Sequence, residues 1–220
     1  MAGRAAAKAG VTKFEVLAPV SNDAKEQIEF QNPYIASVEV EGTCPIIFHR
    51  WSIESVEEKS KAAKGSRAKK TDDVESYVYR DEEGYVCIPT EYFRQAIIQT
   101  ARFKQDPRSP RKSAKDLMKA AIACDTELNR IEDTGRVESK EWDYLFRCRV
   151  VIHGSAITRS RPAFKLGWKA RFRLQILLPE YVSPQFLNEL IALAGKINGV
   201  ADQRPSYGRF QTTSFQTSEV

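Results

Sequence analysis

The sequence is poor in the residues from which most catalytic and metal centres are built. Its 220 residues include only two histidines, and its four cysteines are scattered without a C-x-x-C pair. That distribution argues against a zinc site and favours reduced thiols in an intracellular protein. No P-loop, H-E-x-x-H helix, G-x-S-x-G elbow or G-x-G-x-x-G turn is present. We therefore expect no metal, no cofactor and no classical nucleophile centre, and hence a protein that is more simply read as a binder than as an enzyme.

Long apolar runs are also missing. No stretch approaches the roughly 18 apolar residues that a membrane span needs, and the alanine-rich start lacks the hydrophobic region of a signal peptide. We expect a cytoplasmic protein without a membrane partner. Residues 1–33 are expected to form a mobile tail and lead-in, and residues 34–216 a single domain with insertions at about 58–73 and 104–144.

Positive charge is in moderate excess. Lys and Arg number 34 against 29 Asp and Glu, a net charge of +5 with a pI near 9.0, which suits a polyanionic partner without demanding one. Part of the excess lies in the first insertion, which is nearly devoid of large apolar residues and holds Lys64, Arg67, Lys69 and Lys70. Such a segment is either a solvated loop or an arm that orders on nucleic acid by neutralising phosphates.

Hydrophobic periodicity predicts an α+β fold. Residues with period-2 alternation indicate strands, and apolar residues at helical spacing, with caps at Thr90 and Ser183, indicate helices. The best elements are a strand at 34–42, a helix at 90–103, strands at 145–154 and 170–178, a helix at 183–197 and a strand at 207–215. This β-α-β-β-α-β order is that of a ferredoxin-like antiparallel sheet with both helices on one face.

The expected open face of that sheet is basic. If the apolar sides of the strands face the helices, Arg147, Arg149, Arg171 and Arg173 all project from the other face. Glu39 and the neighbouring Glu41 project there too, so cross-strand pairing is the alternative to a ligand. Two carboxylates do not neutralise four guanidiniums, and the surplus predicts a counter-charge supplied by a partner.

Aromatic residues alternate with basic ones in three segments, at 44–51, 159–169 and 204–210. This combination suits single-stranded nucleic acid, whose bases stack on rings while its phosphates meet cations. The alternative is that Trp168, Phe164 and Phe210 are core residues and that His49 to Trp51 form a packed loop. The candidate nucleic-acid-binding residues are Arg50, Trp51, Lys64, Arg67, Lys69, Lys70, Arg147, Arg149, Arg159, Arg161, Lys165, Trp168, Lys169, Arg171, Arg173, Arg204, Tyr207 and Arg209.

The element order, the basic insertion and the Gly199 to Phe210 turn resemble the Cas7-like, repeat-associated RNA-binding (RAMP) superfamily of CRISPR effectors. Segments 42–51, 159–168 and 204–210 are more specifically similar to uncharacterised phage and prophage proteins. The first resemblance implies single-stranded RNA on the open face of an RRM-like sheet, and subunits that stack into a filament. It places Arg149, Arg171 and Arg173 in the groove, and the basic insertion or the hairpin around Gly84 in the thumb.

The sequence therefore predicts a binder of single-stranded RNA or DNA, either a homo-oligomer or a subunit of a nucleoprotein complex in a bacterial or phage-infected cell. Two alternatives remain. One is a metal-independent endoribonuclease of the CRISPR RNA-processing type, with His49 or His153 as general base, since that chemistry needs only proton transfer and phosphate stabilisation. The other is a structural or adaptor protein of a phage particle, which would oligomerise without nucleic acid.

Overall fold

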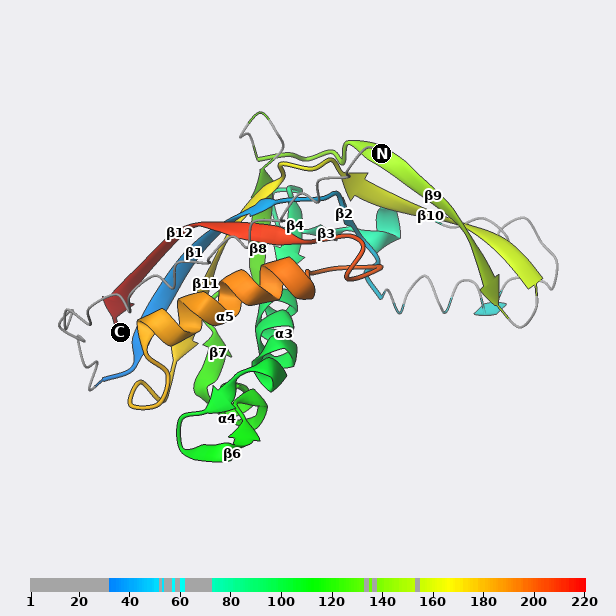
Figure 1. Cartoon of the computed structure of the whole chain (residues 1–220). Coiled ribbons are helices and arrows are strands. Elements are labelled where there is room, and N and C mark those ends of the chain that lie inside the picture. The colour runs from blue at the N-terminus through cyan, green and yellow to red at the C-terminus, as the bar shows by residue number, and fades with distance from the viewer. Residues whose placement is uncertain are drawn as a thin grey trace, which may run out of the picture.

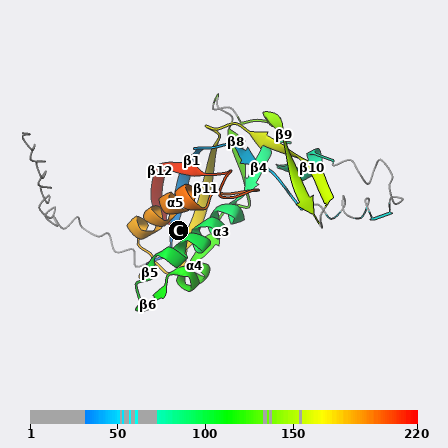
Figure 2. The same cartoon turned by 45° about the vertical axis from the view of Figure 1, so that its right-hand side comes forward.

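The computed structural model describes residues 32–51, 53, 57, 60–61, 73–132, 135, 138–152 and 155–220 (Figure 1). Its elements form a large antiparallel sheet with helices on one face, together with a smaller sheet that projects to one side (Figures 1 and 2). In chain order they are β1 (Tyr34–Gly42), β2 (Ile46–Ile47), η1 (Glu75–Tyr77), β3 (Tyr79–Arg80), β4 (Val86–Pro89), α3 (Thr90–Thr100), η2 (Ala101–Phe103), β5 (Gln105–Asp106), β6 (Ser109–Ser113), α4 (Lys115–Ala121), β7 (Ile122–Cys124), β8 (Leu128–Glu132), β9 (Tyr144–Ile152), β10 (Ser155–Phe164), β11 (Lys169–Ile176), α5 (Pro184–Ile197) and β12 (Phe210–Glu219).

The large sheet has the order β12-β1-β11-β8-β4-β3, and β7 also pairs with β11. Strand β1 lies antiparallel between β11 and β12. Its alternate residues from Tyr34 to Gly42 are buried while those between are half-buried, because successive side chains of a strand point to opposite faces. Strand β11 alternates in the same way. The period-2 pattern of both strands, read from the sequence, is therefore confirmed.

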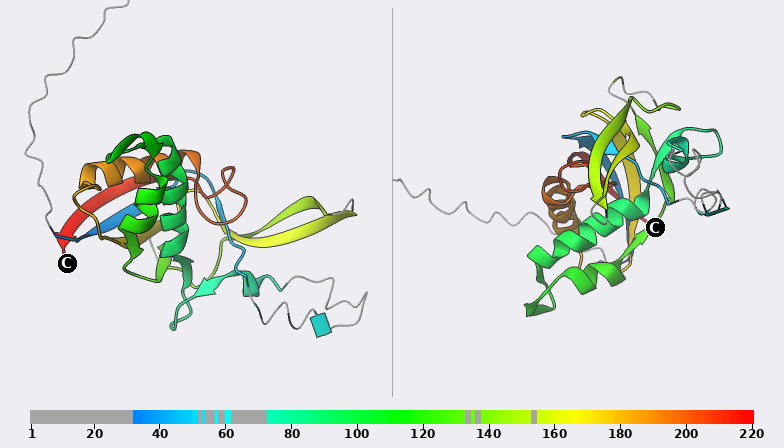
Figure 3. Two further views of the ribbon diagram at one scale, coloured as in Figure 1. Left: turned by 90° about the horizontal axis from the view of Figure 1, so that it is seen from below. Right: turned by 90° about the vertical axis from the view of Figure 1, so that its right-hand side faces the viewer.

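The helices cover the apolar face of this sheet (Figures 1 and 3). Helix α5 begins as the sequence predicts: the Ser183 side chain accepts a hydrogen bond from the Phe186 N–H, and proline follows at the first helical position. Helix α3 seats Phe93 against Phe172 of β11, with the rings stacked at 4.1 Å between centroids, and packs against α5. The core thus lies between the helices and β1, β11 and β12.

One predicted strand belongs elsewhere. Strand β9, expected beside β11, instead pairs with β10 in a separate sheet of order β2-β10-β9. Strands β7 and β8, from a region expected to be an insertion, pair with β11 in its place. The β9–β10 hairpin projects from the body in Figures 1 and 2 and in the left-hand view of Figure 3. The predicted element order is therefore wrong at its second strand, because an alternating pattern does not say which sheet a strand joins.

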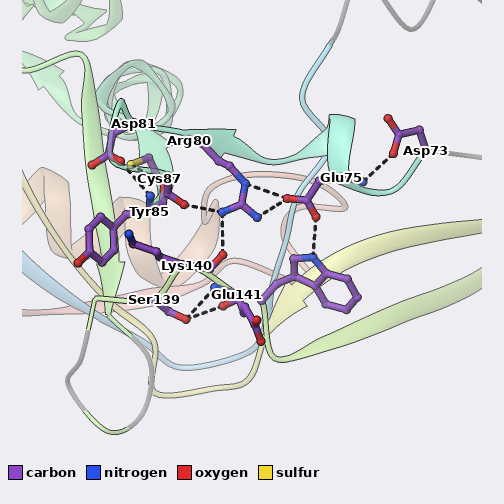
Figure 4. A network of polar contacts seen from close by, with 11 residues as sticks. Asp73, Glu75, Arg80, Asp81, Tyr85, Cys87, Ser139, Lys140 and Glu141 are labelled. Carbon is purple, nitrogen blue, oxygen red and sulfur yellow. Dashed lines mark hydrogen bonds and ion pairs between the residues drawn. The ribbon is translucent and has the colours of Figure 1, made fainter.

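A network of polar contacts braces the base of that hairpin (Figure 4). The Arg80 guanidinium donates to the Glu75 carboxylate, to the Gly84 carbonyl at 2.6 Å and to the Lys140 carbonyl at 2.7 Å. The Trp142 indole donates to the second oxygen of Glu75 at 3.3 Å. These contacts tie the β3–β4 turn to the segment that enters β9.

Arg130 of β8 extends the brace. It lies within 3.0 Å of carboxylate oxygens of Asp81, Glu83 and Glu138 and over the Tyr85 ring at 4.2 Å. Its pKa is raised, first by the hydrogen bond to Glu138. At Asp81, burial raises the pKa of the carboxyl but is outweighed by hydrogen bonds from Tyr85 and Arg130, so the net shift is downward.

No helix in the described part of the chain is long and apolar enough to cross a membrane.

Candidate nucleic-acid interface

The open face of the large sheet is balanced in charge and not cationic. Arg171 pairs with Glu39 directly across the β1–β11 ladder, with Arg171 Nε donating to the carboxylate at 2.8 Å. Arg173 pairs with Asp125 at 3.1 Å. Lys169 stands opposite Glu41 on β1 and Glu132 on β8. The cross-strand pairing considered from the sequence is therefore the arrangement that forms, and three cations on β11 face at least as many acids.

The other two arginines assigned to that face are not on it. Arg147 and Arg149 lie on β9, opposite Ser160 and Thr158 of β10, and both are exposed. Among the described residues neither forms an ion pair. The prediction of a four-arginine face is wrong, because it depended on β9 lying next to β11. Their position on a projecting hairpin leaves both guanidiniums accessible instead.

Three segments far apart in the sequence meet beside the large sheet. The Gly208 N–H donates to the Pro45 carbonyl at 2.9 Å and the Asp202 N–H to the Ile47 carbonyl at 3.0 Å. The Phe48 N–H donates to the Pro162 carbonyl at 3.0 Å. These contacts join segment 44–51 to the turn at 202–209 and to β10. The three aromatic and basic segments of the sequence thus lie together at one place in the fold, which we call the locus.

Trp168 belongs to the core of this locus and not to its surface. It is fully buried, and its indole donates to the Cys44 carbonyl at 2.9 Å. A Cβ at Gly42 would lie 2.0 Å from its Nε1, so the glycine makes room for the ring. Phe164 and Phe210 are buried as well. This burial excludes base stacking on Trp168. All three aromatic residues belong to the hydrophobic core, which was the alternative considered from the sequence.

At the surface of the locus, His49, Arg161 and Asp202 gather around Tyr77. Asp202 Oδ2 lies 3.8 Å from His49 Nδ1 and 3.3 Å from Arg161 Nε. Arg161 Nη2 lies 3.4 Å from His49 Nε2, and its guanidinium stacks over the Tyr77 ring at 4.5 Å. Because a guanidinium only donates, the contact fits a histidine whose Nε2 accepts and whose Nδ1 carries the proton facing Asp202. Arg161 is buried beneath this surface, where it holds His49 and Asp202 in place.

Arg50 continues this surface toward helix α3. Its guanidinium lies over the Tyr79 ring at 5.6 Å, and the Tyr79 hydroxyl is 3.1 Å from that of Tyr92. Burial, followed by the bond to Tyr79, raises the pKa of Tyr92 above its ordinary value. The neighbouring Trp51 is 72% exposed. We call the set the aromatic–arginine surface: His49, Arg50, Trp51, Tyr77, Tyr79, Tyr92, Arg161, Asp202 and Arg204.

A shallow pocket of about 490 Å³ adjoins the aromatic–arginine surface at Asp202 and Arg204. Arg102 of η2 and the amides of Gln99 and Asn198 complete its polar lining. Ala201 and Gln203, on either side of Asp202, have φ angles of 66° and 54°, a left-handed conformation that is costly for residues other than glycine. The turn thus holds Asp202 between the pocket and Arg161.

The remaining predicted residues fall into two groups. Arg159 lies on β10 opposite Cys148, Lys165 is exposed in the turn before β11, Tyr207 packs edge-on against Phe146 at 5.1 Å, and Arg209 is exposed before β12. The basic-arm residues lie outside the described part of the chain, as do residues 1–31 and the second histidine. They are Lys64, Arg67, Lys69, Lys70 and His153.

Sequence reasoning missed the tyrosines of this surface and the role of Asp202. Tyr77 and Tyr79 stand two residues apart just before the hairpin around Gly84, and Tyr92 lies within the helix expected at 90–103. No signal in the sequence brings them beside Arg50. Among the described residues, no three His, Cys, Asp or Glu side chains are grouped as a metal site would require.

The comparisons with known proteins bear on the fold. No protein-family model and no curated protein matches the sequence. Among solved structures, the chain is similar to one from the Type III-B Cmr-beta complex bound to cognate target RNA, with a TM-score of 0.53 and 9% sequence identity. The match covers 86% of this chain and 61% of the other. At that identity the likeness shows a shared fold alone, within a mixed α/β architecture, and does not assign a function.

Proposed function

We propose that the protein binds single-stranded nucleic acid, with RNA as the first candidate, through the aromatic–arginine surface. The observation that carries the proposal is the surplus of guanidiniums beside exposed or half-buried rings. Among the described residues Arg50, Arg204 and the adjoining Arg102 form no ion pair, and Asp202, the one carboxylate of this surface, lies beside Arg161. A phosphate backbone would supply the missing counter-charge.

The rings supply the second half of the recognition. Trp51 offers an exposed indole, and Tyr79 and Tyr92 are half-buried beside Arg50. Stacking of a base on an aromatic side chain contributes about 1 to 3 kcal/mol and works for every base. The surface is therefore expected to bind many sequences, with affinity that falls steeply with salt as bound phosphates release counterions.

The fold supports the same proposal. We infer that β12-β1-β11 with β7 and β8 is a ferredoxin-like core of the Cas7 type, and its structural neighbour belongs to a complex bound to target RNA. In this account the β9–β10 hairpin, with Arg147 and Arg149, is an arm beside the strand's path. The open sheet face takes no part, because its charges are already paired.

The test is the affinity of the full chain for labelled 30-mers of RNA and DNA, measured by fluorescence anisotropy at low salt. The double variant Arg50→Ala with Arg204→Ala should bind at least tenfold more weakly and with a smaller dependence on salt, by about one phosphate for each arginine that is removed. Arg171→Ala is the matched control, since Arg171 is an exposed arginine on the balanced face. Equal losses in both variants, or no binding by the wild type, would refute the proposal.

A second candidate function rests on His49. Its exposure and its contact with Asp202 fit a general base held in one tautomer, whose Nε2 would exchange its 3.4 Å contact with the buried Arg161 for the substrate 2′-hydroxyl. The exposed Arg50, next to His49 in the sequence, would stabilise a pentavalent phosphate. The reaction would be metal-independent RNA cleavage, in which the 2′-hydroxyl attacks the adjacent phosphorus and the 5′-oxygen leaves with a proton.

Cleavage is tested apart from binding. Structured and unstructured RNA is incubated in EDTA with the wild type, with His49→Ala and with Asp202→Asn. Products that carry 2′,3′-cyclic ends and are lost in His49→Ala would establish the nuclease. Intact RNA after saturating binding would remove this function and leave the binding proposal untouched.

A further inference from the structure

The outer edge of β12 has no hydrogen-bonded partner strand among the described residues. Strand β12 ends the order of the large sheet, and among the described residues no strand pairs with the side that faces away from β1. Alternate residues of this ten-residue strand therefore present backbone donors and acceptors along an edge (Figure 1). Natural edge strands are protected by lysines, prolines, β-bulges or short length. Strand β12 has one irregularity, where its register with β1 shifts between Ser214 and Thr212. Between Phe210 and Ser218 the strand has no charge and no proline, and its side chains are glutamine, threonine, serine and phenylalanine.

The opposite edge of the same sheet is protected. Strand β3 is only two residues long. Its Arg80 is committed to Glu75 and to the carbonyls of Gly84 and Lys140. Of the two end strands of this order in the described part of the chain, β12 is thus the one open to edge-to-edge association. An interface that uses the same edge on both partners closes after two copies and does not propagate into a filament.

We propose that β12 pairs with β12 of a second copy in an antiparallel register centred on Ser214, joining two large sheets into one. The charged residues at the two ends of the strand favour a second copy of this chain as the partner. In that register Arg209 of one copy lies opposite Glu219 of the other, at both ends of the interface, and both side chains are exposed. Between these two ion pairs the facing side chains are uncharged, so no like charges oppose one another across the strands.

This interface is independent of nucleic-acid binding, because β12 pairs on the far side of β1 from β11 and does not contribute to the aromatic–arginine surface. It also differs from a head-to-tail stack, in which the two contacting surfaces are different. The dimer should therefore form in protein freed of nucleic acid by nuclease.

Cysteine cross-linking tests the register. In Ser214→Cys the two new thiols face each other across the axis, where opposing Cβ atoms lie about 4.5 to 5.5 Å apart, close enough for a disulfide after slight adjustment. Ser218→Cys is the matched control on the same strand and face, since its two copies lie about 26 Å apart at roughly 3.3 Å per residue. Nuclease-treated full chain is exposed to a mild oxidant, and the wild type reports any background from its native cysteines.

We expect a covalent dimer for Ser214→Cys and background levels for Ser218→Cys. Glu219→Lys, which places like charges at both ends, should raise the dimer dissociation constant several-fold in sedimentation equilibrium. A monomeric wild type at every concentration up to the millimolar range, or cross-linking that is as efficient at 218 as at 214, would overturn the proposal. Both outcomes are read without nucleic acid, so neither bears on the proposed binding.

Discussion

The indole Nε1 of Trp168 donates a hydrogen bond to the backbone carbonyl of Cys44 across 2.9 Å in the buried centre of the molecule. This bond joins the segment that precedes β11 to the segment that follows β1, 124 residues apart in the sequence. It sets the depth at which segment 44–51 lies, and hence the position of His49, Arg50 and Trp51 at the surface above it.

Two tryptophans should therefore behave in opposite ways. Trp168→Phe leaves the Cys44 carbonyl unsatisfied and should lower the free energy of unfolding by about 1 to 3 kcal/mol, with little effect on the RNA affinity of the folded protein. Trp51→Ala removes an exposed ring and should leave stability within about 0.5 kcal/mol. It should weaken RNA binding about 5- to 150-fold if one base stacks there. Urea unfolding and anisotropy measure the two effects, and a stability loss in Trp51→Ala would show that its ring is packed.

The β9–β10 arm gives a second prediction. Arg147→Ala combined with Arg149→Ala removes two exposed guanidiniums that form no ion pair among the described residues, and it should weaken binding of a 30-mer several-fold, while a short oligonucleotide that covers only the aromatic–arginine surface is unaffected. Thermal unfolding should not change. If the double variant weakens short and long strands equally, the arm is part of the main site and not an extension of it.

Asp202→Asn should destabilise the locus. Arg161 is buried, and its guanidinium would lose the carboxylate that lies 3.3 Å from its Nε. Loss of a hydrogen bond to a charged group costs about 1 to 3 kcal/mol. The control is Glu41→Gln on the exposed sheet face, whose effect should stay within about 0.5 kcal/mol. Chemical unfolding that shows no difference between the two variants would mean that Arg161 is satisfied without Asp202.

Acid sensitivity should reside in part at Asp106. The side-chain bond from Arg108, with Nη2 2.8 Å from the carboxylate, lowers the pKa of Asp106 below 3.8, and the carboxyl is buried. Since the folded protein holds this proton less tightly than the unfolded chain does, the stability that Asp106 contributes is present above pH 4 and is lost as pH falls through the folded-state pKa.

Unfolding midpoints between pH 6 and pH 2 test this. Asp106→Asn should be less stable than the wild type at pH 6, and the difference should shrink toward pH 2. Asp116→Asn, at a carboxylate whose side chain is 89% exposed, should follow the wild type throughout. A constant difference between Asp106→Asn and the wild type would contradict the assignment.

Individual strands and helices were more predictable from the sequence than the pairing of one strand with another. The alternation in β1 and β11 and the Ser183 cap of α5 are local signals, and each appears in the structure where it was expected. Strand β9 also forms, but its sheet depends on contacts with β10, a strand that was not among the expected elements. Pairing between strands is decided by tertiary packing, which a single sequence does not display.

The candidate site shows the same division. Arg50 and Trp51 were predicted and are accessible, whereas Trp168, chosen on the same residue type, is buried. Composition alone does not separate an aromatic ring at the surface from one in the core. The charge of the open sheet face was misjudged for a related reason. Arg147 and Arg149 belong to another sheet, and Arg171 and Arg173 are each paired with a carboxylate.

Ultraviolet cross-linking of the full chain to a labelled single-stranded RNA, with the modified residues mapped by mass spectrometry, shows which surface the RNA contacts. We expect cross-links at Trp51, Tyr79 and Tyr92 or in the peptides that contain them, and none in the peptides of β1 and β11 that form the open sheet face. Cross-links confined to β1 and β11 would contradict this expectation and restore the sheet face as the binding surface.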